Sequence, residues 1–337
     1  MSLTATLARS LEEGRGGPLS MAASGVWGAV AARSLVKPLA FPGDKRLIVV
    51  GGATLGGSGK TPLAIAIAGY LASLGESVAF VGHGYGASPE EPRVVSPQDH
   101  ISRVGDEALV AARELARLGV AVVVAPTRQA ALDVALADAR IAIVDGVAQV
   151  GPVRAHLALL AADAERPWGS EACPPRGDLR APRTALVSVC DRIVAVGDAA
   201  GLSYDLSPFD RPIHQVGTRS GGAWLDGRRL TWGELRRRRV GLWTSVARPG
   251  RVLEQLARER VVPKVVAAHA DHAAVSTAET TLRAQLAFAA KVDLWLCTPK
   301  CAVHLPSHLE RIPLAVLEYE LTLGDGLERA LREAVRA

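Results

Sequence analysis

Apolar and polar positions alternate along residues 46–196 in a way that predicts strands followed by helices. Short apolar runs such as "RLIVVGG" (46–52) and "ARIAIVDG" (139–146) are typical of buried strands. Between such runs lie stretches with helical spacing, for example "TPLAIAIAGYLASLG" (61–75), which ends at a glycine. Strands that alternate with helices of about 10 to 15 residues indicate βαβ units, so we expect an α/β fold with a mostly parallel sheet and helices on both faces.

A second alternation of strands and helices begins after residues 212–232, which are rich in glycine and arginine and predict short strands and turns. "VGLWTSVA" and "VDLWLCTP" are expected strands there, and "PGRVLEQLARER" is an expected helix. We therefore predict four parts: a helical segment over 1–40, an α/β domain over 41–210, a hairpin-like linker over 211–235 and a smaller C-terminal α/β domain over 236–337.

Composition and charge narrow the class of protein only slightly. The chain has 337 residues, of which 49% are hydrophobic, and a formal net charge of +5. It can bury two cores and is not a disordered protein. The positive charge is compatible with an anionic substrate or an anionic membrane surface, and the arginines at 236–239 could face phosphates, lipid head groups or solvent. No nucleic-acid partner is expected, since no reading motif or aromatic platform accompanies these arginines.

The environment of the protein is suggested by its cysteines and its first forty residues. Four cysteines without regular spacing favour a reduced, cytoplasmic setting over a disulfide scaffold. Glu12 and Glu13 precede any apolar run, which argues against a secretory signal, and no apolar run reaches the roughly 18 residues of a membrane-spanning helix. Residues 18–40 are weakly amphipathic, with Arg33 and Lys37 near the end, and predict a helix that either packs on the domain or lies in a membrane interface.

A phosphate-binding loop is predicted at "VVGGATLGGSGKTP" (49–62), between a buried strand and a helix. Such a loop uses glycines to turn backbone N–H groups toward phosphates, a lysine that reaches the β- and γ-phosphates, and a hydroxyl that binds Mg²⁺. Thr54 stands where the general pattern G-x-x-x-x-G-K-[ST] has its first glycine. The predicted nucleotide contacts are Thr54, Gly56, Gly57, Ser58, Gly59, Lys60 and Thr61.

A carboxylate that ends a neighbouring buried strand is the expected companion of this loop, because it helps to hold the metal ion. Asp145 in "IAIVDG" fits this role, although it could also be a simple strand-end aspartate. With Thr61, it is the predicted Mg²⁺ site of a P-loop NTPase-like domain.

Further motifs follow the loop in a defined order: "GHGYG" (82–86), "VGDE" (104–107), "RPWGSEACPPRGDLRAP" (166–182) and "ADH" (270–272). From about residue 18 to the end, the loop, "IVDG" and these motifs resemble the tetraacyldisaccharide 4′-kinases of lipid A biosynthesis. That family has Ser or Thr at the position of Thr54.

The resemblance implies an ATP- and Mg²⁺-dependent kinase that phosphorylates the 4′-hydroxyl of a tetraacyldisaccharide 1-phosphate. Such a protein would work at the cytoplasmic face of the inner membrane, as a peripheral or monotopic protein without an obligate protein partner. The resemblance also assigns Asp106 and His272 to the attacking hydroxyl, with His269 as a weaker candidate for the histidine. A carboxylate oriented by a histidine can accept the hydroxyl proton.

Other readings of these residues remain open from the sequence. Asp106 could simply favour the start of a helix, and His272 could cap one. The resemblance places four more residues near substrate or phosphate with less support: Tyr85, Arg128, Asp178 and Arg180.

The chain departs from the family at several positions. Val144 replaces the first of two aspartates, Cys301 replaces the acid of a "TEKD" motif, His83 replaces an arginine and Gly52 an asparagine, while Gln149 is shifted by one from the family's glutamine. A kinase with another acceptor, a family member that binds nucleotide without catalysis, and another P-loop NTPase of switch or chaperone type therefore remain alternatives. Leu55 stands where switch proteins often carry a lysine, which disfavours that class.

A zinc site is a further alternative at the C-terminal end of the chain. The sequence spaces four potential ligands as C-x3-C-x2-H-x3-H: Cys297, Cys301, His304 and His308. A buried cysteine with surface histidines is the competing interpretation.

Overall fold

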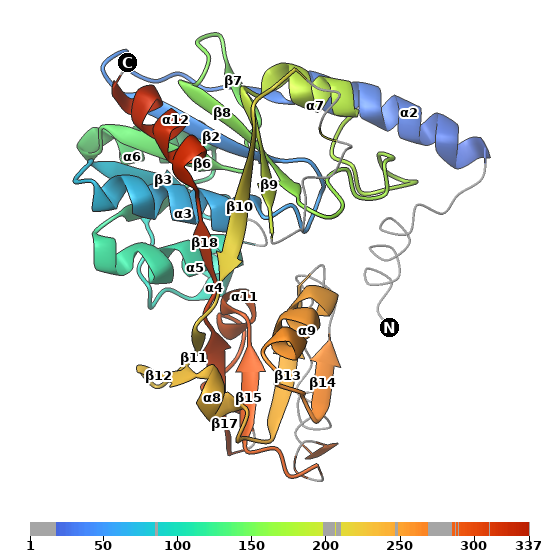
Figure 1. Ribbon diagram of the computed structural model, residues 1–337. Coiled ribbons are helices and arrows are strands. Elements are labelled where there is room, and N and C mark those ends of the chain that lie inside the picture. Colours follow the sequence, from blue (N-terminus) through green and yellow to red (C-terminus); the bar gives the residue numbers. More distant parts are fainter. Residues whose placement is uncertain are drawn as a thin grey trace. The chain divides into compact units, whose positions relative to one another are not determined.

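The computed structural model describes residues 18–84, 87–197, 206, 210–246, 249–268, 285–286, 288, 290–309 and 311–336. The chain divides into two compact units. Of the described residues, the larger unit contains those up to Thr218 and those from Leu321 onward, and the smaller unit contains those from Arg219 to Glu320. Both units are α/β (Figure 1). The last helix, which the sequence analysis placed in the C-terminal domain, belongs to the larger unit.

The larger unit is built on one sheet, in which nine strands of the described chain are ordered β18-β10-β9-β8-β2-β6-β3-β5-β4. Neighbours from β10 to β5 are parallel, and β4 pairs with β5 in the antiparallel sense. The strands are β2 (Arg46–Gly52), β3 (Val78–Val81), β4 (Arg93–Val94), β5 (Ala121–Val124), β6 (Ile141–Asp145), β8 (Leu157–Asp163), β9 (Arg192–Val196), β10 (Ile213–Arg219) and β18 (Glu320–Thr322). A short pair, β1 (Val36–Pro38) with β7 (Gln149–Gly151), lies outside this sheet.

Helices cover both faces of this sheet, which is why its central strands β2, β6 and β8 are apolar except for a charged residue at one end of each. On one face, α3 (Lys60–Ser73) packs against α5 (Asp106–Leu115) and α12 (Asp325–Arg336). On the other face, α6 (Arg128–Asp138) places Leu132 among Leu47, Val49 and Val144 (Figure 1). The remaining helices of this unit are α2 (Pro18–Arg33), α4 (Ile101–Val104), η1 (Ala116–Leu118) and α7 (Arg183–Val189).

The smaller unit has a second sheet of order β12-β11-β17-β15-β13-β14, with β16 paired to β17. Its strands are β11 (Gly222–Leu225), β12 (Arg228–Thr231), β13 (Val240–Thr244), β14 (Val265–Ala268), β15 (Leu294–Cys297), β16 (His308–Leu309) and β17 (Ile312–Leu317). Its helices, within the described residues, are α8 (Trp232–Leu235), α9 (Pro249–Arg258) and α11 (Pro299–Ala302). The predicted hairpin is β11–β12, whose Asp226-Gly227 turn has positive φ at both positions.

Two predictions about surfaces and cysteines can be compared with this fold. All four cysteines are buried and free. Arg236 pairs with Glu259 at 3.3 Å and Arg239 lies 3.9 Å from Asp293, both on exposed side chains, so half of the arginine run belongs to a solvated, ion-paired face.

Helix α2 contacts the rest of the larger unit through a narrow stripe. The Ser24 hydroxyl donates a hydrogen bond of 2.7 Å to the Cys173 carbonyl, and a Cβ added to Gly28 would lie 3.2 Å from Pro182 Cγ. Small residues at these positions therefore allow close approach. Most of the helix projects apolar side chains into solvent, and no helix within the described ranges has the length and apolarity to cross a membrane.

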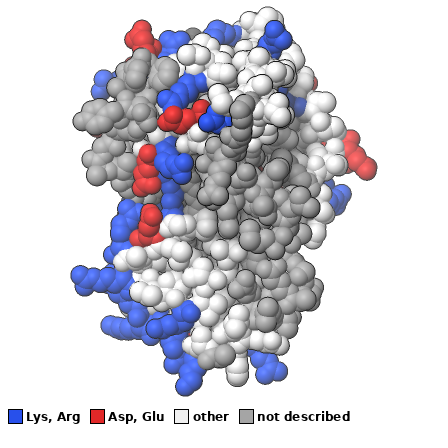
Figure 2. All heavy atoms as spheres, turned by 90° about the vertical axis from the view of Figure 1, so that its right-hand side faces the viewer, with Lys and Arg blue, Asp and Glu red and all other residues white. Residues whose placement is uncertain are grey.

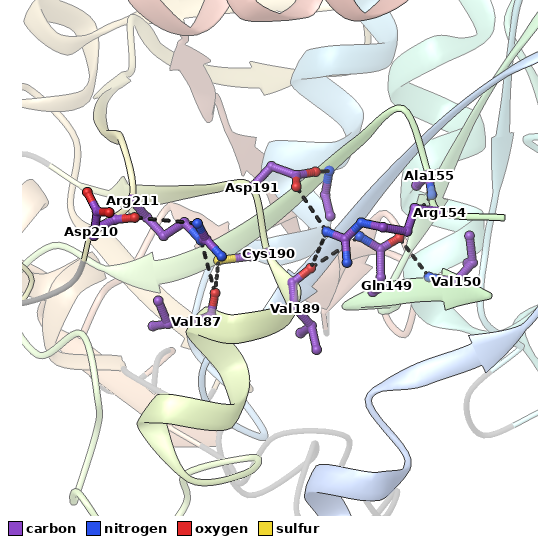
Figure 3. A network of polar contacts seen from close by, with 11 residues as sticks. Gln149, Val150, Arg154, Ala155, Val187, Val189, Cys190, Asp191, Asp210 and Arg211 are labelled. Carbon is purple, nitrogen blue, oxygen red and sulfur yellow. Dashed lines mark hydrogen bonds and ion pairs between the residues drawn. The ribbon is translucent and has the colours of Figure 1, made fainter. Parts of the chain in front are cut away.

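The buried side chain of Gln149 ties β7 to the end of α7 (Figure 3). Its Oε1 accepts hydrogen bonds from the N–H groups of Val150 and Ala155, both at 2.9 Å, and its Nε2 donates to the Val189 carbonyl at 3.1 Å. Arg154 donates to the same carbonyl at 3.3 Å. The glutamine that is displaced by one position in the sequence thus satisfies backbone groups at a helix C-terminus, where carbonyls lack intrahelical partners.

We predict that Gln149→Ala destabilises the protein by about 2–4 kcal/mol, because it leaves two buried N–H groups without an acceptor, removes one of two donors to the Val189 carbonyl and opens a cavity. Urea unfolding followed by circular dichroism measures the change. Gln98→Ala, at an exposed position, is the matched control and should cost less than about 0.5 kcal/mol. Equal stability of the two variants would contradict the role of Gln149.

Candidate active site

The predicted phosphate loop lies at the carboxyl end of β2 and leads into α3, whose first residue is Lys60. Gly59 has a φ of 76°, a left-handed conformation that favours glycine, and an added Cβ would lie 2.7 Å from Val196 Cγ1. This glycine therefore permits both the turn and the close packing on β9. The N–H groups at the start of a helix that follows such a loop form an anion-binding site.

Thr54 fits the loop without a glycine because its φ is not positive. Its hydroxyl donates to the Gly56 carbonyl at 2.6 Å, and its side chain is buried. Thr54 also forms an antiparallel bridge with Leu179, and the Arg180 N–H donates to the Ala53 carbonyl at 2.9 Å. The loop and residues 178–180 are therefore one backbone-paired structure.

Asp178 holds this second segment in shape. Its Oδ1 accepts hydrogen bonds of 2.8 Å from both the N–H and the hydroxyl of Ser170, and it is buried. A Cβ on Gly169 would overlap the same carboxylate at 2.2 Å. The carboxylate of Asp178 is thus engaged within its own loop, while its neighbour Arg180 interacts electrostatically with Asp145 and Glu107.

Four charged or polar side chains meet at the start of α3. The Thr61 hydroxyl donates to Asp145 Oδ2 at 2.6 Å, which joins α3 to the end of β6. Lys60 Nζ forms an ion pair with Glu107 Oε1 at 3.0 Å, which joins α3 to the start of α5. These contacts bring together Lys60, Thr61 and Asp145, as the sequence predicted, and add Glu107.

The electrostatics of this cluster follow from its burial. Burial raises the pKa of Asp145 above its ordinary value, although the Lys60 ammonium and the Thr61 hydroxyl oppose this effect. Burial on its own lowers the pKa of Lys60, but the carboxylates of Asp145 and Glu107 outweigh it and hold that pKa above its ordinary value. Lys60 is therefore a cation before any ligand enters.

Two arginines border the same cluster. Arg128, the first residue of α6, donates from Nη1 to the Asp145 carbonyl at 2.8 Å. Arg180 feels the charges of Asp145 and Glu107, and its buried Nε has no hydrogen-bond partner within the described residues. Burial lowers the pKa of both arginines, which nevertheless remain protonated at neutral pH.

Asp106 begins α5 immediately before Glu107 and is 3% exposed. Gly105 before it has φ 84° and ψ 157°, a conformation available essentially to glycine alone, which turns the chain into the helix. Asp106 Oδ1 accepts the Glu107 N–H at 2.8 Å. Its expected partner His272, the weaker candidate His269, and Tyr85 lie outside the described residues.

The missing acids of the sequence have different surroundings. Val144 is fully buried in the core cluster beneath α6, whereas Asp145 meets α3, so an acid at 144 would face that core rather than Thr61. Cys301 is buried in the smaller unit, where its Sγ accepts hydrogen bonds from the Ser245 N–H at 3.1 Å and the Thr298 hydroxyl at 3.0 Å.

The zinc alternative finds no support in this geometry. Within the described residues, which include all four candidates, no three His, Cys, Asp or Glu side chains are grouped to hold a metal ion. The two cysteines are buried, and His308 is exposed.

The sequence of the chain matches one known protein family. The family described as Tetraacyldisaccharide-1-P 4′-kinase (LpxK) matches residues 20–336 of the chain. The chain belongs to this family. The resemblance inferred from the sequence motifs is therefore confirmed, and the alternative of a switch- or chaperone-type NTPase is not favoured.

Individual relatives of the LpxK family agree with this assignment. A tetraacyldisaccharide 4′-kinase of Methylobacterium sp. (strain 4-46) is 32% identical over 318 residues, or 93% of this chain and 90% of the relative. One from Rhodopseudomonas palustris (strain TIE-1) is 31% identical over 91% of this chain and 88% of its own length. The fold resembles that of LpxK from Aquifex aeolicus solved in complex with ATP, with a TM-score of 0.67, 19% identity and coverage of 94% of this chain and 96% of that chain.

In this LpxK family member, Glu107 belongs to the cluster at the start of α3, although the sequence analysis predicted no site role for it. The "GDE" motif contained the signal, because a second carboxylate beside Asp106 is not needed to begin a helix. Only the structure shows that this carboxylate holds the loop lysine.

We predict that Glu107→Gln tightens binding of a nucleoside triphosphate, the ligand the loop predicts, by about five- to tenfold. The substitution removes an anion from the path of the phosphates and releases Lys60 from its ion pair; a unit charge about 4 Å away is worth about 1 kcal/mol even in water. Isothermal titration calorimetry measures the affinity. Glu114→Gln, at an exposed position of the same helix, should leave it unchanged, and weaker binding by Glu107→Gln would refute the expectation.

Proposed function

We propose that the protein is a tetraacyldisaccharide 4′-kinase that transfers the γ-phosphate of ATP to the 4′-hydroxyl of a tetraacyldisaccharide 1-phosphate. The observation that carries this proposal is the meeting of Lys60, Thr61 and Asp145 at the head of α3 in a chain of this family. The loop N–H groups and Lys60 would bind the β- and γ-phosphates, since both provide positive charge at the helix start.

Magnesium fits the donor set at this position. Asp145 Oδ1 is buried and has no hydrogen-bond partner within the described part of the chain, while Oδ2 accepts the Thr61 hydroxyl. A carboxylate and a hydroxyl, supplemented by phosphate oxygens and water, are ligands that Mg²⁺ commonly takes in kinases. When bound, Mg²⁺ supplies positive charge that stabilises the transferring phosphoryl group.

Asp106 is proposed to accept the proton of the attacking hydroxyl. In this step the O4′–P bond forms, the bond from the γ-phosphorus to the β–γ bridging oxygen breaks, ADP leaves, and the hydroxyl proton moves to the carboxylate. The position of Asp106 beside Glu107, which reaches Lys60, supports this role because it places the carboxylate near the phosphate side of the sheet. His272 is the proposed partner from the family resemblance.

The assay is incubation of the purified protein with ATP, Mg²⁺ and tetraacyldisaccharide 1-phosphate, with detection of the bis-phosphate. We expect product from the wild type and a loss of at least about 100-fold in kcat for Asp106→Asn, the usual range for removing a general base. Affinity for ATP should change by less than about threefold, since the loop is untouched. Asp138→Asn, an exposed carboxylate at the end of α6, is the control. A wild type that binds ATP but forms no product would sink the proposal.

The location proposed for this activity is the cytoplasmic face of the inner membrane. The acceptor implied by the family carries acyl chains, and α2 offers a surface that could contact them or the bilayer. Leu19, Val26 and Val30 are 89%, 67% and 60% exposed, and Arg33 lies at the helix end. Figure 2 shows the side of the molecule toward which α2 extends in Figure 1, and its upper part carries uncharged side chains together with Lys and Arg. Such a helix lies in an interface rather than across it.

We predict that Val26→Glu with Val30→Glu lowers binding to vesicles of phosphatidylethanolamine and phosphatidylglycerol by about tenfold, because two exposed apolar side chains would become charged. Flotation of the protein with the vesicles measures the bound fraction. The matched control, Leu74→Glu with Leu118→Glu, changes two exposed apolar residues outside α2 and should bind as the wild type does. An equal loss of vesicle binding in both double variants would show that α2 is not the membrane-binding surface.

A further inference from the structure

His83 stands at the edge of the candidate active site and has no role in the account above. It follows β3, which lies between β6 and β5 in the sheet. The Gly82 N–H donates to the Val123 carbonyl at 2.9 Å, and a Cβ added to Gly82 would lie 3.1 Å from Ala108 Cβ in the first turns of α5. The chain therefore leaves the sheet beside the start of α5, with the imidazole accessible to solvent.

The charged groups around His83 come from four elements. Lys60 of α3, Arg128 of α6 and Arg180 of the segment paired with the loop are cations that act on it, and the carboxylate of Glu107 of α5 acts on it in the opposite sense. These cations are close to each other as well: a Cβ added to Gly146 would lie 3.3 Å from Arg128 Nη2 and 3.9 Å from Lys60 Cε. Glu107 is already engaged by Lys60 at 3.0 Å.

This surrounding favours an uncharged imidazole in the ligand-free protein. Desolvation lowers the pKa of His83, Arg128 lowers it further, and Glu107 only partly offsets them. An arginine here, which the family carries, would add a permanent charge to three existing cations. A histidine avoids that repulsion while the site is empty and can still become a cation when an anion enters.

We propose that His83 contacts a phosphate group bound in this site. It does so as an imidazolium, together with Arg128 and Arg180. The imidazole takes one proton from solvent as the phosphate enters and donates it in a hydrogen bond to a phosphate oxygen. The phosphate belongs either to the nucleotide or to the acceptor, and the second possibility rests on the proposed function.

Calorimetric titration with MgATP alone and with tetraacyldisaccharide 1-phosphate alone shows which of these two molecules supplies the phosphate that His83 contacts. Each titration is run at pH 7.0 in two phosphate-free buffers that differ in ionisation enthalpy, since the difference in observed heat counts the protons taken up. The proteins are the wild type, His83→Gln, His83→Arg and the control His156→Gln. His156 accepts the Leu47 N–H at the opposite end of β2, so it is removed from the site.

We expect wild type and His156→Gln to take up more protons than both His83 variants in one of the two titrations, which identifies the phosphate that His83 contacts. In that titration the wild-type affinity should rise by about three- to fivefold as pH falls from 8 to 6, if binding raises the lowered pKa of His83 by about one unit, since the full tenfold is reached only below both pKa values. His83→Gln should show no such rise, and His83→Arg should bind with a flat profile as well.

Equal proton uptake and equal pH dependence in wild type and His83→Gln, in every titration where binding occurs, would overturn the proposal. The MgATP titration needs neither acceptor nor turnover. It therefore gives an answer even if the protein fails the kinase assay, and a protein that is an active kinase without His83-dependent proton uptake refutes this inference alone.

Discussion

The buried carboxylate of Asp145 is the group on which the rest of the active site depends. It is 1% exposed at the end of a strand that is buried along its whole length, so its charge must be compensated by neighbours or ligands. Thr61 supplies a hydroxyl, Lys60 a nearby cation, and Arg128 anchors the backbone of the same residue. Asp145 Oδ1 has no hydrogen-bond partner within the described residues, so this oxygen is available to a bound cation.

The groups that compensate the charge of Asp145 come from elements that are distant in the chain but meet at one edge of the sheet. The carboxyl ends of β2, β6 and β3 are adjacent because the sheet is parallel, and helices α3, α5 and α6 all begin at that edge. Residues 178–180 then pair with the backbone of the loop, which brings Arg180 to the same cluster. Positive helix starts, one lysine and two arginines thereby gather around Asp145 and Glu107, with Asp106 beside them, and these cationic groups suit phosphate ligands.

Much of this architecture could be predicted from the sequence, because strand and helix periodicity and the loop glycines are local signals. The helix that follows β2 lies where the pattern placed it, and Lys60, Thr61 and Asp145 meet as expected. The strand β8, next to β2, was not predicted, although all its residues are buried and all but the terminal Asp163 are apolar. The ion pair of Glu107 and the clamp of Gln149 could not be predicted, because each depends on contacts between segments far apart in the chain.

The three residues that differ from the family pattern, Val144, Cys301 and His83, can each be explained by the groups that surround them. At position 144 the strand directs the side chain into an apolar core, where valine costs no desolvation and an acid would need a partner. At position 301 a sulfur accepts the N–H of Ser245 and the hydroxyl of Thr298, so an acceptor is retained while the charge is absent. At position 83 a titratable imidazole stands among cations in place of a fixed charge. None of these three side chains carries a permanent charge, and in the larger unit Lys60, Thr61 and Asp145 still meet at the start of α3.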